Sequence, residues 1–149
     1  YRTDRMVYRK DPYRVNFYPY ERWGAKPQEI VTDRVLDHLA AKNVFQEVVL
    51  ATGGPRVDYL IRGRVKRFEE VSTENGFSAL AQIEFSVMDR KTGEVLFQRR
   101  FSRSSPSKSK PPQGFVNAMA ENLRTLLGDM ASQVSQVIRE THNNSVSWP

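Results

Sequence analysis

The sequence predicts an α+β fold, a two-layer α/β sandwich in which two helices cover one face of a mostly antiparallel sheet. Two segments carry apolar residues at helical spacing, and several others alternate apolar and polar residues as half-buried strands do. Tight-turn residues separate the longest alternating segments, which favours antiparallel neighbours. Because the helices and the sheet each have one apolar side, burying these sides against each other gives two layers.

The first helix is expected over residues 27–42, where Pro27 suits the opening turn because its missing N–H costs nothing there. An apolar stripe at helical spacing follows: Ile30, Val31, Val35, Leu36, Leu39 and Ala40. The second helix is expected over residues 115–140. Its apolar residues recur at steps of three and four, which is the strongest helical pattern in the chain.

Strands are expected over residues 5–9, 13–20, 45–50, 58–71, 77–87 and 95–101. In the second of these, alternation places Tyr13, Val15 and Phe17 on the buried side, and Pro19 ends the strand. Turn-forming residues separate the strands at Asp11-Pro12, at residues 52–55, at residues 74–76 and at residues 91–94.

The length of 149 residues favours a single domain spanning residues 1–149, large enough to bury a core. We expect that core within residues 5–140. Residues 102–113, rich in serine, lysine and proline, are predicted to form a mobile loop because they offer almost nothing apolar to pack. Residues 141–149 are predicted to form a polar tail.

The pattern of chemically reactive residues predicts no catalytic, metal-binding or cofactor-binding site. The two histidines, His38 and His142, have no further ligands at metal-binding spacing. Residues 53–54 are glycines without the lysine and hydroxyl residue of a phosphate-binding loop. Glu69 and Glu70 are neighbours on a strand and therefore project to opposite faces. We expect a protein that is not an enzyme and that uses no cofactor.

The net charge of +6 and the sequence pI near 9.8 favour an anionic partner. A cytosolic nucleic-acid binding module is therefore the alternative function. We consider nucleic acid unfavoured as a partner, because the rings that could stack on bases are predicted on the core face of the sheet. The basic row of Arg62, Arg64 and Lys66 is predicted on the other face.

Tryptophan and arginine are enriched at interface hot spots, which identifies a candidate partner-binding surface. It combines the corner between a strand and the first helix with the exposed sheet face: Arg22, Trp23, Arg62, Arg64, Lys66 and Arg100. For Trp23 a second interpretation stays open, in which its ring plugs the end of the sandwich beneath the first helix.

An ordered set of motifs runs through residues 6–138. It begins with Tyr20, Arg22 and Trp23, followed by Pro27, a helix and then Phe45. It continues with DYLIRGRVKRFEE at residues 58–70 and with FSALAQIEFSVMDRKTGEVLFQRRFS, two strands around an aspartate–x–x–threonine–glycine turn. This set resembles the ABC-type transport auxiliary lipoprotein family, which includes the paraquat-inducible protein C-like proteins.

The resemblance implies a fold similar to the N-terminal domain of the translocation protein TolB. It implies a periplasmic domain held at a membrane, expected to be the outer membrane, by a lipidated N-terminal cysteine that this chain does not include. The implied partners are an ABC transporter and mammalian-cell-entry-type subunits that move lipid between the two membranes of Gram-negative bacteria. We therefore expect an accessory subunit that acts through protein–protein contacts, and a homo-oligomer is compatible with that role.

Overall fold

The computed structural model describes residues 3–11, 13–51 and 56–146. In chain order its elements are β1 (Arg5–Asp11), β2 (Arg14–Arg22), α1 (Pro27–Ala40), β3 (Tyr59–Thr73), β4 (Gly76–Asp89), β5 (Val95–Pro106) and α2 (Gln113–Val146). The strands form one sheet in the order β2-β1-β3-β4-β5, in which β1 and β3 run parallel and the other neighbours antiparallel.

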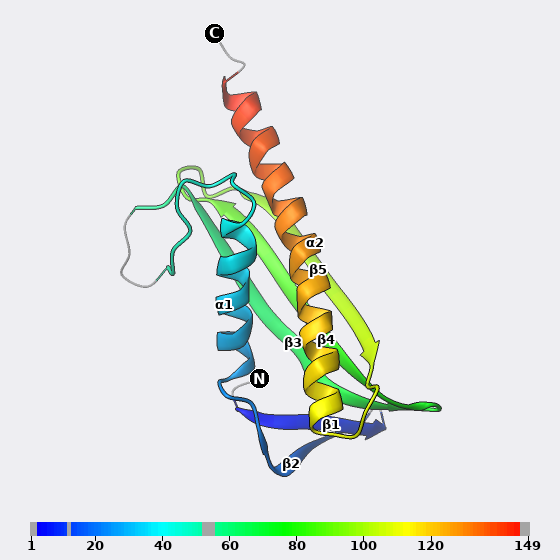
Figure 1. Cartoon of the computed structure of the whole chain (residues 1–149). Helices are drawn as coiled ribbons and strands as arrows, with labels where there is room; N and C mark the ends of the chain where they lie inside the picture. The colour runs from blue at the N-terminus through cyan, green and yellow to red at the C-terminus, as the bar shows by residue number, and fades with distance from the viewer. Residues whose placement is uncertain (1–2, 12, 52–55, 147–149) are drawn as a thin grey trace.

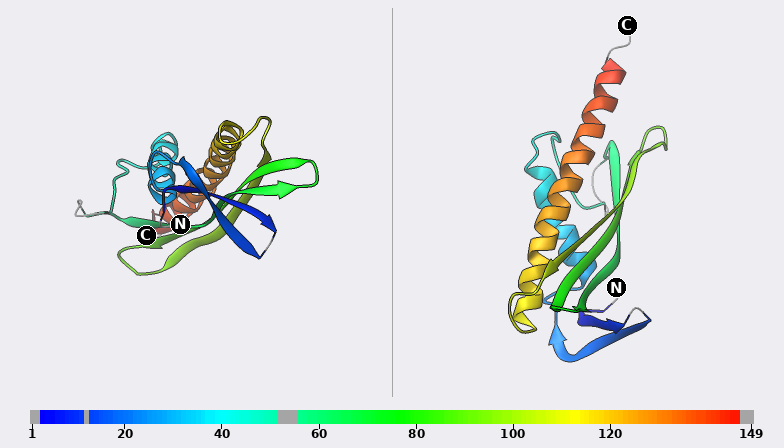
Figure 2. Two further views of the ribbon diagram at one scale, coloured as in Figure 1. Left: turned by 90° about the horizontal axis from the view of Figure 1, so that it is seen from below. Right: turned by 90° about the vertical axis from the view of Figure 1, so that its right-hand side faces the viewer.

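Both helices lie on the same face of the three long strands, while β1 and β2 cross these strands at one end of the molecule (Figures 1 and 2). The predicted two-layer α+β arrangement with two helices on one face is confirmed. The other face of β3, β4 and β5 is covered by no helix in the part of the chain that the structure describes.

The core lies between α2 and the inner face of the long strands. The side chains of β4 that face α2 are at most 2% exposed: Ala79, Ala81, Ile83, Phe85 and Val87. The buried residues of α2 repeat at steps of three and four: Phe115, Met119, Leu123, Leu126, Leu127, Met130, Val134 and Ile138. The alternation predicted for β4 and the stripe predicted for the long helix are thus confirmed between these positions. Phe77, at the hairpin end of β4, is 43% exposed.

α1 begins at Pro27 as predicted. The N–H of Lys26 donates to the carboxylate of Glu29 at 3.2 Å, which satisfies a donor at the helix entrance. The helix ends at Ala40, two residues before the predicted end. Asn43 then takes a φ of 55°, a left-handed conformation that asparagine tolerates better than most residues.

Both hairpin turns between the long strands are confirmed. Thr73 pairs with Gly76 across the β3–β4 turn, and Gly76 has a φ of 129° that favours glycine. In the β4–β5 turn, Oδ1 of Asp89 accepts the N–H groups of Lys91 and Thr92. This aspartate therefore holds the turn through its own side chain.

The buried side of β2 differs from the prediction. Tyr13, Val15 and Phe17 are 92%, 47% and 45% exposed, respectively. β2 is an edge strand, and irregularities in its pairing with β1 shift the register. Alternation alone therefore does not decide which side of β2 meets the core. The half-buried ring is that of Tyr18, which contacts the ring of Tyr8 with centroids 4.8 Å apart.

Three further predictions were wrong. Pro19 lies inside β2 rather than at its end, which an edge strand tolerates because the missing N–H needs no partner. Residues 45–50 form no strand; Phe45 and Val48 pack against the core from an irregular segment instead. α2 continues through residues 141–146, so this part of the predicted tail is helical. Trp148 and the turn at residues 52–55 lie outside the described residues.

The segment predicted as a mobile loop begins as a strand. Residues 102–106 extend β5 by pairing with residues 78–82 of β4. Backbone pairing needs no apolar side chain, and polar contacts replace apolar packing here. The hydroxyl of buried Ser105 donates to Oδ1 of Asn122 at 2.6 Å, and Nδ2 of Asn122 donates to the carbonyl of Ala79 at 2.8 Å. Only residues 107–112 connect β5 to α2.

Candidate interaction surface

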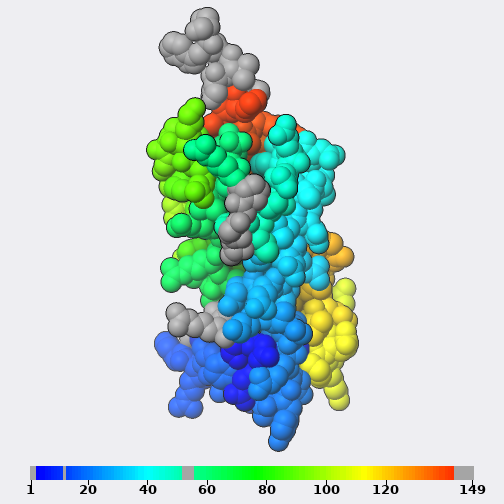
Figure 3. Space-filling view, turned by 90° about the vertical axis from the view of Figure 1, so that its left-hand side faces the viewer, coloured from blue at the N-terminus to red at the C-terminus, as the bar shows by residue number. Residues whose placement is uncertain are grey.

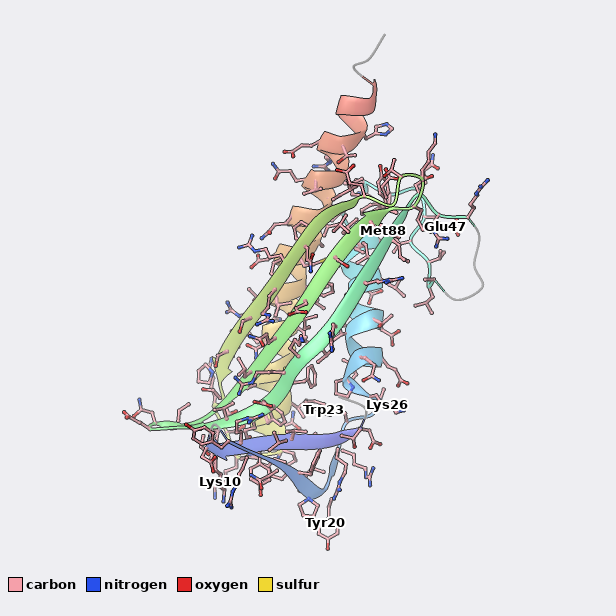
Figure 4. The ribbon with its side chains drawn as sticks, turned by 180° about the vertical axis from the view of Figure 1, so that it is seen from behind. Lys10, Tyr20, Trp23, Lys26, Glu47 and Met88 are labelled. Atoms are coloured by element: carbon pink, nitrogen blue, oxygen red, sulfur yellow. The ribbon has the colours of Figure 1, made fainter. Side chains whose placement is uncertain are left out.

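The face of β3, β4 and β5 that points away from the helices carries the predicted basic residues; this face is turned toward the viewer in Figure 4. Arg64 of β3 lies opposite Glu84 of β4, and Glu84 lies opposite Arg100 of β5. Arg100 hydrogen-bonds Glu84, and Nζ of Lys66 is 4.0 Å from its Oε2. Arg62 follows along β3, opposite Ser86. We call Arg62, Arg64, Lys66 and Arg100 the basic sheet face.

A single carboxylate therefore lies within the basic sheet face. The hydrogen bond from Arg100 holds the pKa of Glu84 below its ordinary value, and the charges of Lys66, Arg100 and Arg64 act in the same direction. Glu84 stays ionised and offsets one of the four positive charges. The remaining excess of positive charge points into solvent, because Arg62, Arg64 and Arg100 are exposed.

Trp23 lies on the other side of the sheet from the basic sheet face. Its ring meets the rings of Phe68 and Phe115 edge to face, with centroids 5.1 and 5.2 Å away. Its backbone N–H donates to the carbonyl of Asp4 at 2.7 Å, and its indole Nε1 is buried without an acceptor. These contacts support the interpretation in which Trp23 plugs the end of the sandwich (Figure 4).

Arg22 stands at the end of the edge strand, where Nη1 pairs with Oδ1 of Asp4 at 2.7 Å. Its side chain is 56% exposed. The structure thus brings Arg64, Lys66 and Arg100 together around one carboxylate. It places Arg22 on an edge two strands away and turns Trp23 into the helix-covered side.

Sequence reasoning missed a second exposed surface, along β2 and the turn before it. It carries large apolar or aromatic side chains at 45–92% exposure: Tyr13 in the turn, and Val15, Phe17 and Tyr20 in β2. The guanidinium of Arg5 lies 5.6 Å from the centre of the Phe17 ring. The available signal was Pro19, since a proline inside a strand is typical of a sheet edge.

Two adjacent buried carboxylates join the β1–β2 hairpin to β3. Glu69, which is fully buried, accepts hydrogen bonds from Arg9 of β1 at 2.9 Å and from Arg67 at 2.8 Å. Glu70 accepts a hydrogen bond from the hydroxyl of Tyr18 at 2.5 Å, and its Oε2 is buried without a partner. The two carboxylates have separate partners, in agreement with the predicted opposite orientations.

Burial raises the pKa of Glu70, although the Tyr18 hydrogen bond acts in the other direction. Burial also raises the pKa of the Tyr18 hydroxyl, and the hydrogen bond to Glu70 adds to that shift. Glu70 therefore favours its neutral form more in the folded chain than in the unfolded chain.

This shift predicts a pH dependence of stability. Between the unfolded pKa of Glu70, near 4.5, and its higher folded pKa, the folded chain binds more protons than the unfolded chain. The free energy of unfolding is therefore lost as pH rises through this window. Urea unfolding from about pH 4.5 to about pH 7 should show less of this loss in Glu70→Gln than in the wild type.

Tyr18→Phe is the matched comparison. Removing the hydroxyl takes away the one contact that lowers the pKa of Glu70, so the loss of stability should extend to higher pH. A Glu70→Gln variant with the same pH dependence as the wild type would contradict this assignment.

Among the described residues, no group of three or more histidine or acidic side chains is placed to hold a metal ion. The described helices include none that is long and apolar enough to cross a membrane. What the arrangement offers chemically is a charged, open sheet face and an exposed aromatic strand edge.

Comparison with known proteins decides the family. A family model of the ABC-type transport auxiliary lipoprotein component matches residues 2–131. The chain belongs to this family. The match confirms the resemblance seen in the motifs, and it lends no support to the nucleic-acid alternative. No curated protein matches the chain.

Solved structures agree on the fold of this auxiliary lipoprotein component. Protein XCC0632 from Xanthomonas campestris, a DUF330 protein, superposes with a TM-score of 0.86 at 17% identity, covering 95% of this chain and 79% of that one. The hypothetical protein CT253 from Chlamydia trachomatis gives a TM-score of 0.60 at 13% identity, over 83% and 93% of the two chains. A putative lipoprotein from Caulobacter crescentus gives 0.50 at 16% identity, over 80% and 86%.

Proposed function

We propose that this auxiliary component is the periplasmic domain of a lipoprotein that binds an ABC transporter and mammalian-cell-entry-type subunits moving lipid through the envelope. It acts through protein–protein contacts and catalyses no reaction. A lipid on a segment preceding this chain anchors it, at the outer membrane. The family membership supports the transport role, and the open basic sheet face is the observation that supports a contact role.

The proposed contact is the basic sheet face, with Arg22 as an additional cation at the edge of β2. Three cations around one carboxylate, with Arg62 beside them on β3, attract an acidic partner surface, and such complementarity sets partner choice and association rate. Arginine also forms bidentate hydrogen bonds with carboxylates, which gives the contact geometric specificity. Trp23 contributes indirectly, by holding the corner from which Arg22 projects.

Charge reversal tests this proposal. We expect the Arg62→Glu/Arg64→Glu double variant of the full-length lipidated protein to recover at least about tenfold less transporter subunit on co-purification from membranes. The matched control is Arg34→Glu/Arg124→Glu, because both arginines are exposed but lie on α1 and α2. Equal loss in the two double variants, or no loss in either, would contradict a contact through the basic sheet face.

The nucleic-acid alternative has its own test. A contact with nucleic acid that supports function would retain the chain on single-stranded DNA at physiological ionic strength. We expect no retention at that ionic strength. If the chain were retained and the Arg62→Glu/Arg64→Glu variant were not, the partner of the basic sheet face would be nucleic acid and not a protein.

A further inference from the structure

A cavity of about 870 Å³ lies on the helix side of the molecule, away from the basic sheet face. α1 forms one wall, the first half of β3 forms another, and residues 44–51 close a third side. Figure 3 shows the surface of this side, where α1 and the segment that follows it lie beside the long strands. The volume falls within the range of about 300–1,000 Å³ that is typical of small-molecule sites.

The walls of this cavity are apolar. Val35 and Leu36 line it from α1, and Ile61 and Val65 line it from β3. The ring of Phe85 also lines the cavity; it is only 2% exposed and packs over Gly63, which has no side chain. A Cβ atom on Gly63 would come within 3.0 Å of the Phe85 ring. Glycine at this strand position therefore leaves room for the Phe85 ring at the cavity wall.

The charged residues that line the cavity are gathered at one of its ends. Its charged or titratable lining residues come only from the segment before β3, the start of β3 and the last turns of α2: Glu47, Arg56, Asp58, Tyr59, Arg139 and His142. These elements meet at the end of the molecule opposite the β1–β2 hairpin (Figure 1), and Glu47 is labelled there in Figure 4. The remaining lining residues are uncharged; their polar side chains are Gln46, next to Glu47, and Gln28 and Thr32 toward the other end.

The dimensions match one hydrocarbon chain. Lining residues run along α1 from Gln28 to Leu39, about 16 Å of helix. They run along β3 from Tyr59 to Val65, about 20 Å of strand. One acyl chain spans about 15 Å, half the thickness of a bilayer's hydrocarbon core.

We propose that this cavity binds a single long acyl chain, with the attached polar head at the charged end beside Arg56 and Arg139. The apolar walls take the hydrocarbon, and the charged end keeps the head in water. The cavity is separate from the basic sheet face, so this proposal does not depend on the proposed partner contact.

The direct test is to measure the binding of palmitate to the full chain by isothermal titration calorimetry. We expect one saturable site, and affinity should rise about fourfold per methylene from decanoate to palmitate as more chain is buried. Palmitoyl-lysophosphatidylcholine is the second arm. Tighter binding than palmitate would assign the site to phospholipid acyl chains, and weaker binding would assign it to free fatty acids; either result supports an acyl site.

Val35→Trp fills the groove with an indole and should weaken palmitate binding at least about tenfold. Ala40→Trp is the matched control, since it adds the same ring to an exposed position of α1 that does not line the cavity. The NMR chemical shifts of methyl groups give a second readout, which uses the wild-type chain. Palmitate should change those of Val35, Ile61 and Val65, while those of Val7 on β1 and Leu123 on α2, which are buried and do not line the cavity, stay in place.

Several outcomes would overturn the proposal. These are the absence of saturable palmitate binding, equal binding by Val35→Trp and Ala40→Trp, and shifts that spread evenly over all methyl groups. A concentration-dependent dimer that Val35→Trp abolishes, without palmitate binding, would assign the groove to a second copy of the chain instead. None of these outcomes bears on Arg62→Glu/Arg64→Glu, so failure here is distinguishable from failure of the transporter contact.

Discussion

Replacing Trp23 by alanine is expected to lower the free energy of unfolding by about 3 kcal/mol, the loss typical of a large aromatic side chain removed from a core. The indole fills the space between Phe68 of β3 and Phe115 of α2, so its removal leaves a cavity where the two layers meet. Equilibrium urea unfolding measures the change.

Tyr20→Ala is the matched control for Trp23→Ala. Tyr20 is also aromatic and lies three residues earlier, but its side chain is 88% exposed. We expect its replacement to change the free energy of unfolding by less than about 0.5 kcal/mol. If Trp23→Ala were as stable as Tyr20→Ala and lost transporter binding, Trp23 would be an interface residue and not a plug.

Glu69→Ala is expected to cost about 3 kcal/mol, because it removes the carboxylate that Arg9 and Arg67 share. We take the lower end of the range for a broken buried pair, since the Arg67 side chain is 36% exposed and can still reach water. The loss should appear first at the β1–β2 hairpin, which this carboxylate ties to β3. Hydrogen exchange of the β1 amides would detect that local opening before global unfolding.

Glu84→Ala is the matched control for Glu69→Ala. Both carboxylates lie on the outer face of the sheet and both accept hydrogen bonds from arginine, but the Glu84 side chain is 30% exposed and that of Glu69 is 0% exposed. Water screens an exposed pair, so Glu84→Ala should be nearly neutral. Equal effects of the two substitutions would contradict the view that burial makes Glu69 important.

The sequence predicted those elements whose own pattern is decisive. α2 and β4 have long, regular apolar patterns with one buried side each, and the structure follows them closely. The sequence did not predict which side of β2 is buried, because an edge strand with an irregular register exposes residues that alternate as a core strand would. Nor did it predict the strand at residues 102–106, where Ser105 and Asn122 supply buried hydrogen bonds in place of apolar packing.

The sequence likewise predicted one part of the candidate site and not the rest. Alternation along β3 correctly placed Arg62 and Arg64 on the uncovered face, because local periodicity determines that side. Lys66 lies at a register shift, and its Nζ reaches the same face 4.0 Å from Oε2 of Glu84. The grouping of Arg22 and Trp23 with them could not be tested by pattern, since strand order and the direction of one side chain depend on tertiary packing. The proposed acyl-chain cavity had no sequence signal, because its lining comes from segments far apart in the chain: α1, residues 44–51, β3, β4 and α2.

Photo-crosslinking in cells tests the central claim most directly, namely that this lipoprotein component engages its transporter through the basic sheet face. A photoreactive amino acid would replace Arg62 or Arg64 in the full-length protein, with Arg34 on α1 as the control position. We predict crosslinks to a subunit of the ABC transport system from positions 62 and 64 and none from position 34. Crosslinks from position 34 alone, or none to any transport subunit, would contradict the claim.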